Sequence, residues 1–219
     1  MATQTDIINL AIYKLAQSIA IPAITDESKA ADIFNRLWEP MRDLVLAARV
    51  WPWALKAQAL AVDTEPAQPG WRLRYSYPND CITAKALTDA NGLRAVRMLS
   101  NYCDDNYLRG VWGRLAFDWE TSYGEQGTTI NADQDGAYLV YVVRVEDTGR
   151  YPPNFVNALA CRLAAEAAPP MIGEVGLNNK QSLLQEYNVA LTDAGAHSYN
   201  EGSLVNDYVT PALASREGG

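Results

Sequence analysis

The stretch RVWPWALKA, residues 49–57, decides how the chain is divided. The residues before it have apolar side chains at helical spacing, whereas those after it alternate between apolar and polar, as strands do. Pro52 cannot continue a helix, so we expect the helix to end there. Trp51 and Trp53 are then expected to fill the junction between a helical layer and a β layer. The alternative is that the two rings are exposed and stack on a ligand.

Two amphipathic helices are expected before this junction. Apolar residues recur at helical spacing over residues 5–19 and again over residues 30–48. Pro22 lies in the short connection between them, so the two helices are expected to be antiparallel. Pro40 lies inside the second helix and removes one of its backbone hydrogen bonds.

Strands are expected after the junction. In WRLRYSY, residues 71–77, Leu73 and Tyr75 alternate with Arg72 and Arg74, which predicts a strand with one buried face. The same alternation is present in VWGRLAFDW, residues 111–119, while AYLVYVVRVE, residues 137–146, is apolar on both faces and predicts a central strand. The segment therefore predicts an antiparallel sheet or small sandwich.

Helical spacing returns near the C-terminus. One helix is expected over residues 153–168, with Pro169 and Pro170 ending it, and another from about 178 to 194. The last residues, 198–219, lack periodicity and predict an extended arm. The predicted fold class is therefore α+β: a four-helix core assembled from both chain ends, with an inserted antiparallel β-sheet or small sandwich and a C-terminal arm.

Composition excludes several classes of protein. The apolar content of 48% is enough for a core, and the net charge of −8 gives no global basic surface for gripping nucleic acid or an anionic membrane. No apolar run approaches the length of a membrane span, and no signal peptide is evident. Cys81, Cys103 and Cys161 are widely spaced, which favours reduced thiols and synthesis in the cytoplasm.

Motifs for chemistry are weak. His197 is the sole histidine and there is no Cys-x-x-Cys pair, so we predict no metal site. DQDG, residues 133–136, lacks the ligand spacing of a calcium loop, and GEVGLNNK, residues 173–180, lacks the spacing of a phosphate-binding loop. There is no Gly-x-Ser-x-Gly nucleophile elbow. We therefore predict neither a cofactor nor a catalytic residue.

Two alternatives involve the predicted strands. Glycoside hydrolysis needs two suitably spaced carboxylates, so one alternative function is a peptidoglycan-degrading enzyme that uses carboxylates of the predicted strands. The acids that could serve it lie in or beside predicted turns: Glu120, Glu125, Asp133 and Asp135. The other alternative function is a carbohydrate-binding module, in which an exposed Trp112 or Trp119 would stack on a sugar ring.

The chain as a whole resembles a known family. The features are a helix ending near KLA, residues 14–16, an acidic DES at 26–28, EPMRDLVLAARVWPWA at 39–54, YSYPNDCI at 75–82, and RYPPNFVNALACRLAAEAAPPM at 150–171. Together they resemble the head-to-tail adaptor proteins of short-tailed bacteriophages, the tail tubular protein A-like group. The resemblance covers nearly the whole chain, and the middle strands contribute least to it.

The resemblance implies a structural virion protein without enzymatic activity. Such a protein forms a ring, commonly of twelve copies, at the head–tail junction, where it binds the portal protein and a downstream nozzle or tail tubular protein. Double-stranded DNA passes through the ring without specific binding. The implied domains are a ring-forming helical domain, residues 1–52 and 150–197, an inserted β domain, residues 53–149, and the arm, residues 198–219.

The arm carries the predicted contact residues. A segment that orders on its partner can wrap a large surface, and apolar side chains would anchor it. We expect five residues to contact the portal or a neighbouring subunit: Leu204, Val205, Tyr208, Val209 and Leu213.

Overall fold

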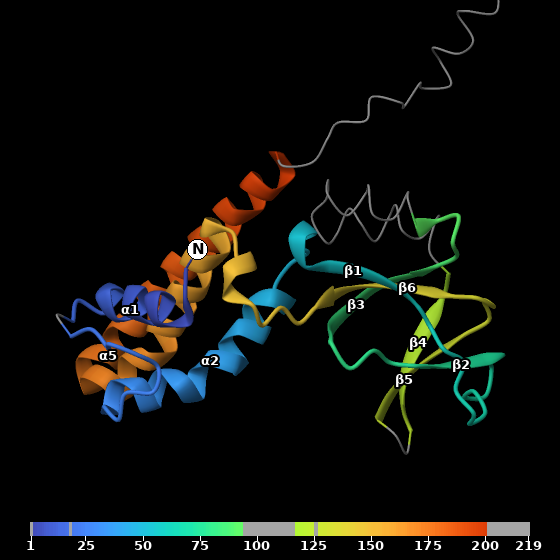
Figure 1. Cartoon of the computed structure of the whole chain (residues 1–219), viewed down its shortest axis with the longest axis horizontal. Helices are drawn as coiled ribbons and strands as arrows, with labels where there is room; N and C mark the ends of the chain where they lie inside the picture. Colours follow the sequence, from blue (N-terminus) through green and yellow to red (C-terminus); the bar gives the residue numbers. More distant parts are fainter. Residues whose placement is uncertain (1, 18, 94–116, 125–126, 201–219) are drawn as a thin grey trace, which may run out of the picture.

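The computed structural model describes residues 2–17, 19–93, 117–124 and 127–200, the last six of these as backbone. Within these ranges the fold is α+β, with three α-helices and two small antiparallel sheets. The helices α1 (Gln4–Lys14), α2 (Lys29–Ala47) and α5 (Pro153–Asn200) lie together at one end of the molecule, and the strands lie at the other (Figure 1).

The change from helix to strand occurs at the stretch that predicts it. Helix α2 continues through Pro40 and ends at Ala47, five residues before Pro52, where we had expected its end. Pro52–Ala54 form the short 3-10 helix η1, and strand β1 begins at Leu55. The predicted change of architecture is therefore confirmed, although the helix stops earlier.

Helix α5 consists of two helical arms, as predicted, but the break between them lies beyond the two prolines. Its torsion angles are non-helical at Ile172 (φ −127°, ψ 16°) and Gly173 (φ 61°, ψ −132°). Glycine adopts such a positive φ at little cost because it has no Cβ. The chain therefore turns at Gly173, and the helix runs through Pro169 and Pro170 instead of ending there.

The two arms of α5 lie side by side and run antiparallel. Lys180 Nζ is 2.7 Å from Glu166 Oε2, and the Arg162 guanidinium lies 5.5 Å from the centre of the Tyr187 ring. The predicted four-helix core is not confirmed in that form, since the described chain has three helices. Its third helix folds back on itself at Ile172 and Gly173, between the two helices that the sequence predicted.

Helices from both chain ends share one hydrophobic cluster. Its fully buried side chains come from all three helices, from the junction and from strand β6 (Tyr138–Val143): Ile7, Ile8, Ile12, Phe34, Val45, Leu46, Trp51, Val142, Phe155, Leu159 and Leu163. Ala158, Ala160, Ala164 and Ala168 are also buried, which brings α5 close to its neighbours. None of the helices in the described ranges is long and apolar enough to cross a membrane.

The strands form two three-stranded sheets. In the first, β6 (Tyr138–Val143) is central between β1 (Leu55–Ala59) and β3 (Cys81–Thr88). In the second, β5 (Gly127–Ala132) lies between β2 (Leu73–Ser76) and β4 (Trp119–Gly124). The predicted central strand is confirmed, because four consecutive side chains of β6, residues 139–142, are fully buried.

Strand β2 has one buried side chain, Arg74, on the face that the sequence assigned to solvent. Tyr75 is buried as predicted, and Arg72 is exposed, but Arg74 is also buried. Its guanidinium lies between two carboxylates, with Nε 3.2 Å from Asp63 Oδ2 and Nη1 bonded to Glu65. The connection between β1 and β2 therefore covers this face, which strand alternation alone assigned to solvent.

Candidate functional site

The predicted arm residues Leu204, Val205, Tyr208, Val209 and Leu213 lie outside the residues that the structure describes. Helix α5, which precedes them, is described as far as Asn200. In Figure 1 the last turns of α5, coloured orange-red, extend past the other helices. The prediction for the five residues is therefore untested.

The two tryptophans that raised the question of a ligand surface are packing residues. Trp51 is 1% exposed, and its ring lies edge-on to Phe155 with centres 5.0 Å apart. Trp53 lies 5.0 Å from the same Phe155 ring and 5.7 Å from Tyr151. The expectation that they fill the junction is confirmed, and the alternative of an exposed stacking site is wrong.

The carboxylates proposed for glycoside hydrolysis hold parts of the β region in place. Glu120 Oε2 accepts from Trp71 Nε1 at 3.0 Å, and Asp133 Oδ1 accepts from the backbone N–H of Arg72 at 2.8 Å. Asp135 Oδ1 accepts from the backbone N–H of Gly136 at 2.9 Å. Glu125 is not described, so the structure gives no observation that favours this reaction.

The tryptophans proposed for sugar binding give no support either. Trp119 is partly buried and packs against the cluster that contains Tyr75 and Ile130. Trp112 lies outside the described ranges. The described residues therefore give no exposed, coplanar pair made of these two rings on which a sugar could stack.

Groups that could bind metal or act as nucleophiles are poorly placed in the described part of the chain. In that part, no group of three His, Cys, Asp or Glu side chains is placed to hold a metal ion. The side chain of His197 and the whole of Cys103 are not described. Burial raises the pKa of Cys81 to about 11 and also raises the pKa of Cys161. Both thiols are therefore poor sources of the reactive thiolate.

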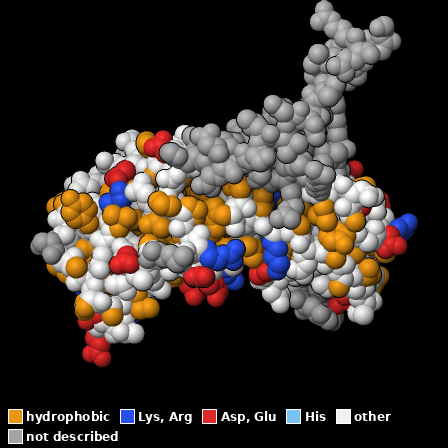
Figure 2. Space-filling view, turned by 45° about the horizontal axis from the view of Figure 1, so that its top comes forward, with side chains coloured by type: hydrophobic (Ala, Val, Ile, Leu, Met, Phe, Trp, Pro, Cys, Tyr) orange, Lys and Arg blue, Asp and Glu red, His pale blue; other side chains and the backbone are white. Residues whose placement is uncertain are grey.

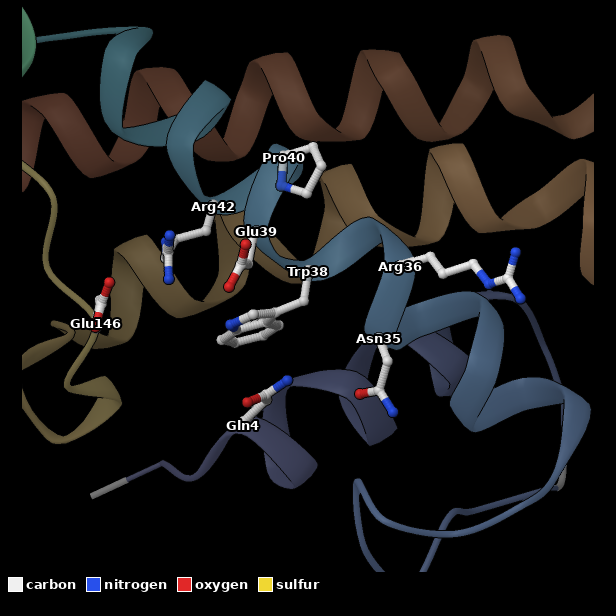
Figure 3. Close-up of a pocket in the computed structure, with 8 residues that line it drawn as sticks. All are labelled: Gln4, Asn35, Arg36, Trp38, Glu39, Pro40, Arg42 and Glu146. Atoms are coloured by element: carbon white, nitrogen blue, oxygen red, sulfur yellow. The ribbon is translucent and has the colours of Figure 1, made fainter.

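A polar hollow lies on α2 instead. It has a volume of about 570 Å³ and is lined by residues from the start of α1, the middle of α2 and the loop after β6 (Figure 3). We call it the α2 hollow; its lining residues are Gln4, Asn35, Arg36, Trp38, Glu39, Pro40, Arg42 and Glu146. Its volume falls within the range of about 300–1,000 Å³ that is usual for ligand pockets.

Asp43 fixes one wall of the α2 hollow to the strands. Its Oδ1 accepts from Arg42 Nε at 2.8 Å, and its Oδ2 accepts from Arg144 Nε at 3.0 Å. Because Arg144 directly follows β6, this carboxylate ties α2 to the loop that carries Glu146. The Tyr151 hydroxyl donates to the Val145 carbonyl at 2.6 Å and holds the same loop.

Two mostly buried side chains of the α2 hollow carry donor atoms that remain accessible and have no described acceptor. Trp38 and Arg42 are each 5% exposed. Trp38 Nε1 donates to no described residue, and Arg42 donates through Nε alone, so its two Nη groups have no acceptor among those residues. In Figure 3 the nitrogen end of the Trp38 ring is on the side where Arg42 and Glu146 lie.

The carboxylates of the α2 hollow also lack described partners. Arg36 pairs with Asp32 at 3.0 Å, and Arg42 shares Asp43 with Arg144, so both cations of the lining already have an acidic partner. Glu39 and Glu146 are exposed and have no cationic partner among the described residues. The hollow therefore offers both free donors and free acceptors.

Sequence reasoning missed the α2 hollow. Trp38 was assigned to the core stripe of α2, and Glu146 is distant in sequence, so spacing could not bring them together. One signal was present: Arg42 follows Trp38 by four residues, which places the two side chains on one helix face. Asp43, which orients Arg42, belongs to the EPMRD stretch on which the family resemblance partly rests.

The chain has no match among models of known protein families, and no curated protein matches it significantly. Membership of the adaptor family therefore stays a proposal.

Proposed function

We propose that this chain is a structural virion protein, the head–tail adaptor of a short-tailed bacteriophage. It acts at the head–tail junction as a ring of twelve copies that binds the portal protein above and a nozzle or tail tubular protein below. The ring extends the DNA channel for genome retention and ejection, and the chain performs no catalysis.

The observation that carries this proposal is the hydrophobic cluster shared by α1, α2 and α5. It joins helices that precede the strands in sequence to the helix that follows them, which supports a single helical body with the strands as an insertion. We propose that the two arms of α5 count as two helices of a four-helix ring body. The domains are then residues 1–52 and 150–197 for that body, 53–149 for the β insertion and 198–219 for the arm.

Exposed apolar side chains support a contact between subunits. On α5, Val175, Leu177 and Val189 are 60–63% exposed, and Tyr13 at the end of α1 is 77% exposed. Figure 2 shows hydrophobic side chains gathered over the helical part of the molecule on the face in view. A ring needs two different surfaces that fit each other around a closed circle, and such side chains suit that purpose.

The acidic charge supports a role as a conduit. Each phosphate neutralised by lysine or arginine releases counterions and adds affinity for DNA, which would slow its passage. The net charge of −8 disfavours such binding. DNA therefore passes along the ring without being held by it.

Binding to the portal protein of the same phage tests this proposal. We would mix the purified full-length chain with assembled portal rings and measure co-sedimentation. A variant with Leu204, Val205, Tyr208, Val209 and Leu213 all changed to serine tests the arm, and a variant with Thr3→Ser serves as a folded control. We expect the control to bind and the arm variant to bind at least about tenfold more weakly.

Two results would count against the proposal. If the unaltered chain does not bind the portal at all, the adaptor function is wrong. If the arm variant binds as tightly as the unaltered chain, the function stands but the five residues are not the contact.

A further inference from the structure

We propose that the α2 hollow binds a peptide segment of another protein chain through an arginine side chain and its adjoining main-chain carbonyl groups. The residues that line the hollow would bind such a segment whether or not the chain is an adaptor.

The free carboxylates call for a cationic group. Glu39 and Glu146 come from different elements, α2 and the loop after β6, and both line the same hollow. Arg36 is paired with Asp32, and Asp43 is shared by Arg42 and Arg144, so the lining and its ion-pair partners hold four carboxylates against three cations. A guanidinium has donors in a fixed planar fork, so one arginine can bond to two carboxylates at once.

The buried donors call for carbonyl oxygens beside that cation. Trp38 Nε1 and the Arg42 Nη groups have no described acceptor, and both side chains are more than nine-tenths buried. The donor atoms themselves are not among the fully buried atoms that lack a partner, so they can bond to water, and a ligand oxygen would take the place of that water. The peptide backbone supplies neutral carbonyl oxygens at regular intervals, close to its own side chains.

A free anion does not fit the same groups. An anion would satisfy Trp38 and Arg42, but it would lie beside the unpaired carboxylates of Glu39 and Glu146, which repel it. A simple cation would satisfy those carboxylates and leave Trp38 and Arg42 without acceptors. A basic residue within a peptide meets both requirements.

Asp43 keeps the hollow in this state. It holds the Arg42 guanidinium by Nε, which leaves the Nη groups without an acceptor among the described residues, and it fixes the loop that carries Glu146 through Arg144. Asp43 is therefore a positioning residue for both halves of the site.

The test uses the full chain and three blocked tripeptides: acetyl-Gly-Arg-Gly-amide, acetyl-Gly-Gln-Gly-amide and acetyl-Gly-Glu-Gly-amide. The readout is the indole N–H resonance of Trp38 in nitrogen-15 NMR spectra, assigned by its loss in Trp38→Phe. We expect the arginine peptide to shift this resonance saturably, and the glutamine and glutamate peptides to bind at least about tenfold more weakly.

Charge-neutral variants separate this site from a general surface effect. Glu39→Gln combined with Glu146→Gln should weaken binding of the arginine peptide by about tenfold or more, whereas Glu174→Gln, an exposed change on α5, should not. The proposal is overturned if the glutamine peptide shifts Trp38 as the arginine peptide does, or if the double variant binds as the unaltered chain does.

Discussion

Trp51 donates its indole N–H to the main-chain carbonyl oxygen of Val45 at a distance of 3.0 Å. Val45 lies in the last turn of α2, where carbonyl groups have no partner within the helix. The side chain of Trp51 therefore completes the end of α2 while its ring packs on Phe155 of α5. One residue of the RVWPWALKA stretch thus ends a helix and joins it to the other chain end.

Replacing each junction tryptophan by phenylalanine should have unequal effects. Trp51→Phe leaves the buried Val45 carbonyl unpaired, whereas Trp53 Nε1 is buried and already has no acceptor among the described residues. We expect Trp51→Phe to lower the free energy of unfolding by about 1–3 kcal/mol more than Trp53→Phe does. Urea unfolding of the two variants measures this difference, and equal losses would contradict the role given to the Val45 bond.

Gly176→Ala should destabilise the chain although alanine is the better helix former. A Cβ at Gly176 would lie 2.1 Å from the carbonyl oxygen of Ala168, and that backbone atom cannot move aside as a side chain could. Such overpacking costs about 1–3 kcal/mol, which exceeds the gain of about 1 kcal/mol in helix propensity. Thermal unfolding checks it.

The matched control for this prediction is Ser182→Ala, an exposed position on the same helix arm. It should change stability by no more than about 0.5 kcal/mol. A Gly176→Ala variant that is more stable than the unaltered chain would show that the two arms of α5 do not pack as described.

Asp80 should contribute to stability in a way that depends on pH. Burial alone would raise its pKa, but hydrogen bonds from Lys56 Nζ at 2.6 Å and the Tyr141 hydroxyl at 2.8 Å outweigh this and lower the pKa. A lowered pKa in the folded state means that the stabilisation is present above the unfolded value, about 3.9, and is lost as pH falls through the folded value.

Asp80→Asn should therefore be less stable than the unaltered chain at neutral pH, and the difference should shrink as the pH falls below about 4. Urea midpoints between neutral and acidic pH give the measurement. Asp193→Asn, an exposed change on α5, is the control. A difference that stays constant across this range would mean that the charge of Asp80 does not contribute.

Much of the architecture follows from sequence patterns of short range. The change of period at residues 49–57 predicted where helices give way to strands, and the apolar run of β6 predicted a central strand. Both features are determined by residues that are close together in sequence, so the spacing of apolar residues is enough to predict them. The burial of Trp51 was predicted for the same reason.

The parts that were missed depend on contacts between distant residues. Arg74 is buried because Asp63 and Glu65 reach across β2, and alternation contains no information about that connection. The first arm of α5 continues through both prolines and ends only where Gly173 takes a positive φ, three residues after the second proline. The α2 hollow needs α1, α2 and the loop after β6 together, so no single segment predicts it.

The central claim is that this chain closes into a ring on the portal. Native mass spectrometry of portal rings saturated with the full-length chain measures it directly. We expect a complex in which the added mass equals twelve copies of the chain, with no partly filled species at saturation. A portal that gains no mass, or that gains a variable number of copies with no closed stoichiometry, would contradict the account.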